Sequence, residues 1–213
     1  MLTPNSSVDH ARGAVRGFTL IELAVTVTLM ALLVMAGLPS FMTWIRNSQV
    51  RTVAEALRDG VHRAQSEAVR LNQSVVLSLT NATPMLNAPS VANGKNWAIQ
   101  TIAPFNGADP SRPATFVMGG ALTDVASGVS IAGTTFAMCF NANGRLIQVP
   151  SPTGTPAATG VPNATCAAGV QQFDITQANA DRRLRVRVEV GGQVRMCDPD
   201  RPTLSATSPE GCP

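Results

Sequence analysis

Residues 18–38 read FTLIELAVTVTLMALLVMAGL, and Glu22 is the only charged residue among them. As an α-helix, a run of this length extends about 30 Å, the thickness of the hydrocarbon core of a bilayer. Arg12 and Arg16 precede the run, and basic residues beside a membrane span favour the cytoplasmic side. The sequence therefore predicts a single-pass membrane segment with a cytoplasmic N-terminus and the rest of the chain on the other side.

A cleavable secretory signal peptide is the alternative interpretation, with Val34-Met35-Ala36 as its cleavage site. Such a signal has an apolar core of about 7 to 15 residues and normally no carboxylate inside it. The run here is longer and carries Glu22 near its start. These two features favour a retained membrane segment.

The helical pattern continues beyond the apolar run as an amphipathic helix. Apolar residues follow steps of three and four, the spacing of one helix face. They are Val50, Val53, Ala54, Leu57, Val61, Ala64, Ala68 and Leu71. We expect one helix over residues 18–72, with residues 18–40 in lipid or against like subunits and residues 41–72 packed on a head domain. Pro39 removes a backbone hydrogen bond and is expected to kink or locally melt this helix.

Residues 73–213 have the texture of an antiparallel β-sheet head, with short apolar runs between Gly, Pro, Asn and Ser. The predicted strands are Ser74–Leu79, Trp97–Ile102, Thr115–Met118, Thr135–Phe140, Arg145–Val149, Gln171–Ile175, Arg183–Val190 and Gln193–Cys197. Asn143-Gly144 and Gly191-Gly192 mark hairpin turns, and residues 80–96 and 150–162 are expected to be irregular. The predicted fold class is α+β, a long N-terminal helix on an antiparallel β-sheet head.

The chain has four cysteines, all from residue 139 onward. They are widely spaced and contain no C-x-x-C pair, which favours disulfides and an oxidising compartment over metal binding. Four cysteines allow three connectivities. Adjacency along the chain favours pairing Cys139 with Cys166 and Cys197 with Cys212.

The sequence offers little for catalysis. His62 is the only histidine after residue 17, so neither a histidine-based triad nor a metal cluster can be assembled. No phosphate-binding loop or dinucleotide-binding glycine pattern is present. We therefore expect no enzymatic activity, no metal and no cofactor.

The segment Arg16-Gly17-Phe18-Thr19-Leu20-Ile21-Glu22-Leu23, followed by Pro39, resembles the class III signal of type IV pilins and type II secretion pseudopilins. The resemblance implies that prepilin peptidase cleaves after Gly17, which removes residues 1–17 as a leader and leaves Phe18 to be methylated. It also implies a bacterial inner-membrane subunit with a periplasmic head, which then enters a pilus or pseudopilus.

Glu22 lies four residues after Phe18 and hence on the same helix face. A carboxylate is too costly to leave unpaired in hydrocarbon. As in the family it resembles, Glu22 is expected to pair with the Phe18 ammonium of a neighbouring subunit, so that Phe18, Glu22 and Pro39 serve assembly. The alternative is that the carboxylate reaches water at the membrane edge.

In the head, the segments Thr134–Phe136, Asn143–Arg145 and Gly192–Pro199 resemble the FimT branch of the FimT/GspH minor pilins. Some members of this branch bind DNA through a Gly-Arg-x-Arg motif, which maps by resemblance to Gly192, Gln193, Val194 and Arg195. Gln193 replaces the first arginine of that motif and removes one phosphate contact.

A row of arginines adds a second basic feature. Strand alternation places Arg183, Arg185 and Arg187 on one face, about 6.6 Å apart. Together with Arg195 the row could follow the phosphates of double-stranded DNA without reading its sequence. The alternative is an ordinary solvated strand face.

Three functional hypotheses follow. The first is a minor pilin that assembles with other minor pilins and the major pilin of a type IV pilus. The second is an H-type pseudopilin of type II secretion, and the third is a DNA receptor for uptake, which can coexist with the first.

Overall fold

The computed structural model describes residues 17–104, 112–123, 126, 128–133, 135–149, 159–201, 203 and 208–212. Residues 1–16 of the leader, Thr134 and most of the irregular stretch 150–162 lie outside these residues. The chain divides into two compact units, one ending at Phe41 and the other beginning at Met42. Helix α1 (Leu20–Leu71) contributes to both units.

Helix α1 is unbroken at Pro39. The local melting expected at this proline is therefore not seen. A proline removes one backbone hydrogen bond of the helix, while the bonds of the turns on either side are kept.

The head-side half of α1 buries one face. Its buried residues are Val50, Val53, Ala54, Leu57, Gly60, Val61, Ala64 and Ala68. The predicted apolar stripe is confirmed except at Leu71, which is partly exposed at the end of the helix. Gly60 is also buried on this face, because the Trp97 ring packs against it. A Cβ added to Gly60 would lie 3.4 Å from that ring.

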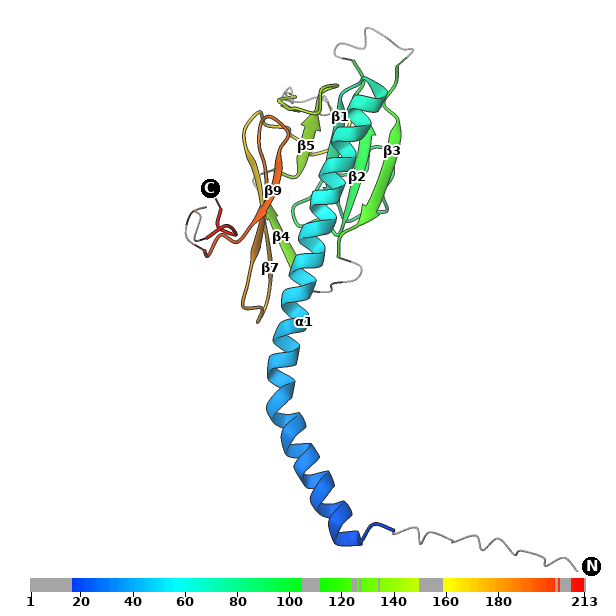
Figure 1. The fold of residues 1–213 in the computed structure, drawn as a ribbon. Coiled ribbons are helices and arrows are strands. Elements are labelled where there is room, and N and C mark those ends of the chain that lie inside the picture. Colours follow the sequence, from blue (N-terminus) through cyan, green and yellow to red (C-terminus); the bar gives the residue numbers. More distant parts are fainter. Residues whose placement is uncertain are drawn as a thin grey trace, which may run out of the picture. The chain divides into compact units, whose positions relative to one another are not determined.

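The head contains two antiparallel sheets (Figure 1). One has the order β3-β2-β1-β5-β6 and the other the order β4-β7-β8-β9. The strands of the first sheet are β1 (Val75–Thr80), β2 (Asn96–Thr101), β3 (Phe116–Ala121), β5 (Ala137–Phe140) and β6 (Leu146–Ile147). Those of the second sheet are β4 (Val129–Gly133), β7 (Gln171–Gln177), β8 (Leu184–Val188) and β9 (Val194–Cys197).

The main core lies between the buried face of α1 and one face of each sheet. Leu77 and Phe140 come from the first sheet, and Phe173, Ile175 and Val186 from the second. Each of these side chains is fully buried. The removal of this apolar surface from water is the main force that holds the helix and both sheets together.

A smaller core covers the other face of the first sheet. Val76 and Cys139 project there from β1 and β5 and meet Val149, Val161 and Ala164 from the following loops. The Cys139–Cys166 disulfide fixes this loop cover to the sheet, with Cα atoms 5.6 Å apart.

Most predicted strands lie within one to three residues of the observed bounds, and the largest differences are at β4 and β6. Strand β4 was not predicted, because Val129–Gly133 is short and contains Ser, Ala and Gly, which carry little strand propensity. Strand β6 is only two residues long, although residues 145–149 were predicted. The pairing with β5 ends at Ile147. The Leu146 N–H donates to Val190 O in the turn after β8, and Val149 forms an isolated bridge with Cys166.

Candidate functional site

The N-terminus of α1 is capped by Thr19. The Glu22 N–H donates to Thr19 Oγ1 at 3.3 Å, and the Leu23 N–H donates to the Thr19 carbonyl at 3.1 Å. A threonine followed three residues later by glutamate is the pattern of a capping box. The helix therefore begins at Leu20, two residues later than predicted.

The predicted processing residues Gly17 and Phe18 lie ahead of this cap, outside the helix. The Phe18 side chain is 80% exposed, and a Cβ added to Gly17 would meet no atom within 4 Å. The bond between the two residues therefore lies in accessible, irregular backbone, as cleavage by a peptidase requires.

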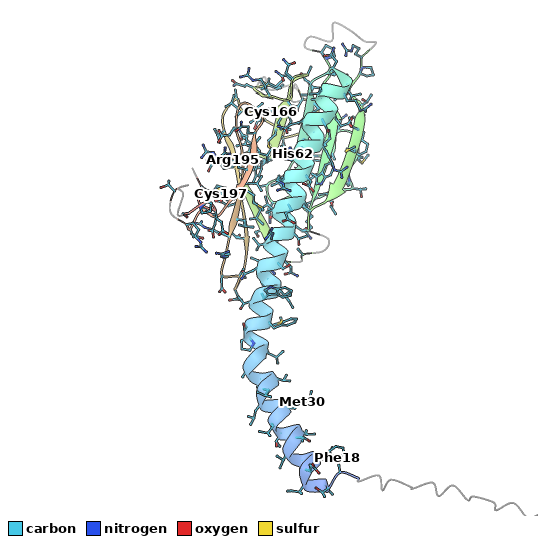
Figure 2. All side chains as sticks on the ribbon, viewed as in Figure 1. Phe18, Met30, His62, Cys166, Arg195 and Cys197 are labelled. Atoms are coloured by element: carbon cyan, nitrogen blue, oxygen red, sulfur yellow. A yellow bond between two sulfur atoms is a disulfide. The ribbon has the colours of Figure 1, made fainter. Side chains whose placement is uncertain are left out.

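The apolar part of α1 contains a window of mean hydropathy 2.2, which is long and apolar enough by length and composition to cross a membrane, and none of it is buried. Figure 2 shows side chains such as Met30 projecting from the helix with nothing packed on them. This segment therefore requires lipid or other helices around it, since water would leave its apolar surface exposed.

The polar side chains within this apolar part differ in whether they have a hydrogen-bond partner. The Thr26 hydroxyl donates to Leu23 O at 2.9 Å, and the Thr28 hydroxyl donates to Val25 O at 2.9 Å. Among the described residues, the Glu22 carboxylate has neither a hydrogen-bond nor an ion-pair partner. Unlike the two threonines, Glu22 therefore has no hydrogen-bond partner for its side chain within its own helix.

The structure places the predicted arginine row on the outer face of β8 and beside it. Three arginines there are each paired with a carboxylate. Arg183 binds Asp200, Arg185 binds Asp174 and Arg187 binds Glu189, with shortest N–O distances of 2.7, 2.6 and 2.7 Å. Asp174 lies directly opposite Arg185 in the pairing of β7 with β8.

These ion pairs change the electrostatics of the row. The hydrogen bond that Arg183 donates to Asp200 holds the pKa of Asp200 below its usual value, and the hydrogen bond that Arg185 donates to Asp174 raises the pKa of Arg185. The three arginines are largely neutralised within the head, so the row is less basic than the sequence indicated.

The segment that resembles the DNA-binding motif forms the turn and start of β9. Arg195 is exposed and lies directly opposite Arg187 in the pairing of β8 with β9. Figure 2 shows Arg195 and Cys197 on this strand. Gln193 is exposed at the turn, while Val194 packs against the core.

Gly192 joins the two sheets at the surface of α1. The Gln65 side-chain amide donates to the carbonyls of Gly144 and Gly192, which belong to the hairpin turns of the first and second sheets. We refer to Gln65, Gly144 and Gly192 as the Gln65 clasp. Sequence reasoning predicted both turns but missed Gln65, because no local pattern connects it with residues so distant along the chain.

The C-terminal segment is held to the second sheet by covalent and ionic contacts. Cys197 pairs with Cys212, with Cα atoms 5.1 Å apart. The buried Asp198 side chain is approached by Arg182 at 3.9 Å and by Arg201 at 3.7 Å. Both disulfides thus have the connectivity that adjacency along the chain favoured.

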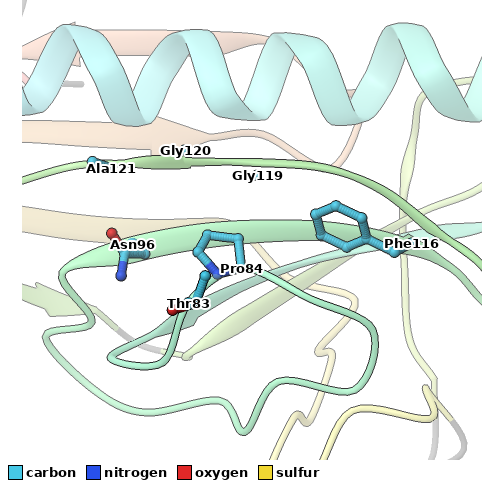
Figure 3. A pocket seen from close by; sticks show the side chains of 7 residues that line it. All are labelled: Thr83, Pro84, Asn96, Phe116, Gly119, Gly120 and Ala121. Atoms are coloured by element: carbon cyan, nitrogen blue, oxygen red, sulfur yellow. The ribbon is translucent and has the colours of Figure 1, made fainter.

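A hollow at the edge of the first sheet offers no reactive side chain. Figure 3 shows Thr83 and Pro84 lying beside Gly119 and Gly120 of β3. None of the residues lining it is ionisable, and Pro84 and the Trp97 ring occupy the space that Cβ atoms at the glycines would need. In the described part of the chain, no group of three or more His, Cys, Asp or Glu residues is placed to hold a metal ion.

Comparison with known proteins gives one family match. Residues 12–38 match the model described as the prokaryotic N-terminal methylation motif. No curated protein sequence matches the chain significantly.

Several solved structures are similar in architecture at low sequence identity. The type IV minor pilin FimU of Pseudomonas aeruginosa is 17% identical, with a TM-score of 0.47, over 78% of this chain and 96% of that one. The minor pseudopilin EpsH of the Vibrio cholerae type 2 secretion system is 11% identical, with a TM-score of 0.38, over 72% and 99%. Escherichia coli GspH is 13% identical, with a TM-score of 0.40, over 73% and 94%.

The motif match covers Gly17, Phe18 and Glu22, the residues that carried the resemblance seen in the sequence. The same residues lie at the exposed, capped start of an apolar helix. The N-terminal segment of this chain, residues 12–38, thus carries the prokaryotic N-terminal methylation motif.

Proposed function

We propose that this chain is a minor pilin, which is stored in the bacterial inner membrane and assembles through its N-terminal helix into a type IV pilus. Its N-terminus is cytoplasmic and its head periplasmic. Prepilin peptidase cleaves after Gly17, and the new Phe18 amine is methylated. Other minor pilins and the major pilin are its partners, and the FimT-like branch is the one its head segments favour.

The observation that carries this proposal is the state of Glu22. Its carboxylate is exposed at the start of an apolar helix and has no partner among the described residues. In lipid an unpaired carboxylate costs several kcal/mol, and a cation from outside the subunit removes this cost. The Phe18 ammonium of a neighbouring subunit lies at the corresponding depth and supplies that cation. Assembly is then the step that gives the Glu22 carboxylate an ion-pair partner.

The test compares wild-type chain with Glu22→Gln and with Glu55→Gln in the producing strain. Glu55 is a matched control, because it is a partly exposed carboxylate on the head-side half of the same helix and pairs with Arg51. We expect Glu22→Gln to stay in the membrane fraction but to disappear from sheared filaments, while Glu55→Gln is incorporated normally. Normal incorporation of Glu22→Gln would refute the proposal, as would a mature N-terminus other than Phe18 in mass spectrometry.

The alternative is an H-type pseudopilin of type II secretion, which requires the same N-terminal chemistry. A deletion strain separates the two. Loss of surface pili with normal export of folded proteins supports the pilus, whereas the reverse pattern supports the secretion system.

DNA binding is a second candidate function, favoured by the placement of Arg195 opposite Arg187. Two like charges in directly opposed cross-strand positions repel each other unless an anion lies between them. We expect Arg195→Gln to weaken salt-sensitive binding of duplex DNA and to lower its salt slope by about 1. Arg183→Gln is the control, since Arg183 is already bound to Asp200. Absence of binding by the wild-type chain at low salt would end this candidate.

A further inference from the structure

We propose that Met42, Trp44 and Arg46 form an interfacial collar, which seats this subunit in the lipid headgroup layer on the side of the membrane that carries the head. The inference deepens the proposed function, because it rests on the chain being anchored in a bilayer. The proposal places these residues at the boundary between lipid and water. Neither the methylation motif nor the assembly of helices explains why these residue types occur here.

The first observation is the exposure of a large aromatic side chain on the head unit. Trp44 is 63% exposed and Met42 is 44% exposed. Tryptophan is a poor residue for a surface that meets only water, because most of its large side chain is apolar. At the boundary of a bilayer both properties of its ring are satisfied, with the apolar body in the acyl region and the indole N–H among the headgroups.

The second observation is the position of these residues in the sequence. The apolar run ends at Leu38, and Arg46 is the first charged residue after Glu22. Trp44 and Arg46 thus follow the end of the run within about two helical turns. An aromatic residue and a cation beyond the end of an apolar span are the arrangement that fixes membrane helices at the interface.

The third observation is the place where the head begins to contact the helix. Asn47 Oδ1 accepts from the backbone N–H groups of Asp181 and Arg182, at 3.0 and 3.3 Å. The turn between β7 and β8 is therefore held to the helix three residues beyond Trp44, about 4.5 Å along its axis. Both turn residues are charged and exposed, so drawing the helix deeper into lipid would desolvate them.

Together these observations limit the depth of the subunit from both sides. Withdrawal toward water would expose the apolar run, and deeper insertion would bury the charged turn beside Asn47. The collar occupies the short interval between these limits. A membrane surface is therefore a better match for it than an adjacent subunit, which would not need an indole followed by a cation.

The experiment uses the full-length chain in phosphatidylcholine vesicles whose acyl chains are brominated either near the headgroup or near the bilayer centre. Bromine quenches a nearby indole, and Trp44 and Trp97 are the only two tryptophans in the chain. Trp97 is 8% exposed in the head core and provides an internal reference. The variants are Trp44→Phe, which leaves Trp97 alone, and Trp97→Phe, which leaves Trp44 alone.

We expect shallow bromine to quench wild-type fluorescence more than deep bromine, and Trp44→Phe to lose this quenching. Because this comparison needs only wild-type chain and Trp44→Phe, it holds even where Trp97→Phe does not fold. Stronger quenching by deep bromine would overturn the collar. So would quenching of Trp44 by aqueous iodide alone, or protection that grows with the ratio of protein to lipid, which would indicate a neighbouring subunit. If the chain is extracted from the vesicles by alkali, the anchoring proposal itself fails, whereas firm insertion without shallow quenching removes only the collar.

Discussion

Replacement of Gly192 by alanine tests whether the Gln65 clasp holds the two sheets together. Gly192 has a φ of +93°, and a Cβ added there would lie 2.5 Å from Gly144 O and 2.9 Å from Gln65 Nε2. Its neighbour Gly191 is a matched control, because a Cβ there would meet no atom within 4 Å. The two glycines are adjacent in one exposed turn, but only one of them has no room for a side chain.

The expected loss follows from two contributions. A side chain on a left-handed backbone costs about 1–2 kcal/mol. The nearest obstacle is a backbone carbonyl rather than a flexible side chain, so the turn must shift, which adds about 1–3 kcal/mol. We expect Gly192→Ala to lower the free energy of unfolding by about 2–5 kcal/mol, and Gly191→Ala to change it by less than about 0.5 kcal/mol. For a chain of this size, each kcal/mol lowers Tm by about 2–4 °C.

Thermal unfolding of the two full-length variants in detergent, with disulfides oxidised, measures this difference by near-ultraviolet circular dichroism. A common Tm for both variants would refute the role assigned to Gly192. The result also decides how functional data on this turn are interpreted. A variant of Gly192 that fails in the cell would be expected to fail through stability, whereas variants of the exposed turn residues would not.

Three further predictions concern the same head. Gln65→Ala leaves two turn carbonyls without their donor and should lower the free energy of unfolding by about 1–2 kcal/mol in urea titrations, and an unchanged midpoint would contradict the clasp. Replacing Cys139 and Cys166 by serine removes closure of a loop of sequence separation 27, worth about 3.5 kcal/mol, which chemical denaturation without reductant would measure. A reduced wild-type sample, in which Cys197–Cys212 opens as well, should lose more stability than this variant. Arg183 lowers the pKa of Asp200 in the folded chain. The ionised Asp200 carboxylate therefore stabilises the fold at pH values above its unfolded-state pKa, and this contribution disappears as the pH falls through its lower folded-state pKa. Asp200→Asn should therefore lose less stability than wild type between neutral pH and the acid range, and parallel acid titrations of the two would refute the pairing.

The parts of this fold set by local periodicity could be predicted from the sequence. The apolar stripe from Val50 to Ala68 follows the helical period, so its buried face was predictable without knowing what covers it. The same holds for the alternation in β8, which sends Val186 and Val188 into the core. The helix start differed by two residues, because the Thr19 cap depends on a hydrogen bond that competes with a continued helix.

Features that depend on register between distant strands could not be predicted. Asp174 lies opposite Arg185 only because β7 and β8 pair with this register. The sequence of β8 shows three arginines on one face but does not show which carboxylates that face meets. Trp44 is a different case, because an aromatic residue and a cation after an apolar run are a signal that the sequence itself contains.

The four residues that resemble the DNA-binding motif differ in how strongly the fold itself requires them. Gly192 is needed by the clasp and Val194 packs against the core, so the fold accounts for both without reference to a ligand. Gln193 and Arg195 are exposed, but Gln193 carries no charge to attract phosphate. The electrostatic part of any contact with DNA at this turn must therefore come from Arg195, reinforced by Arg187 directly opposite it. Since Arg187 is itself paired with Glu189, the strength of such a contact depends on whether phosphate can compete with that carboxylate.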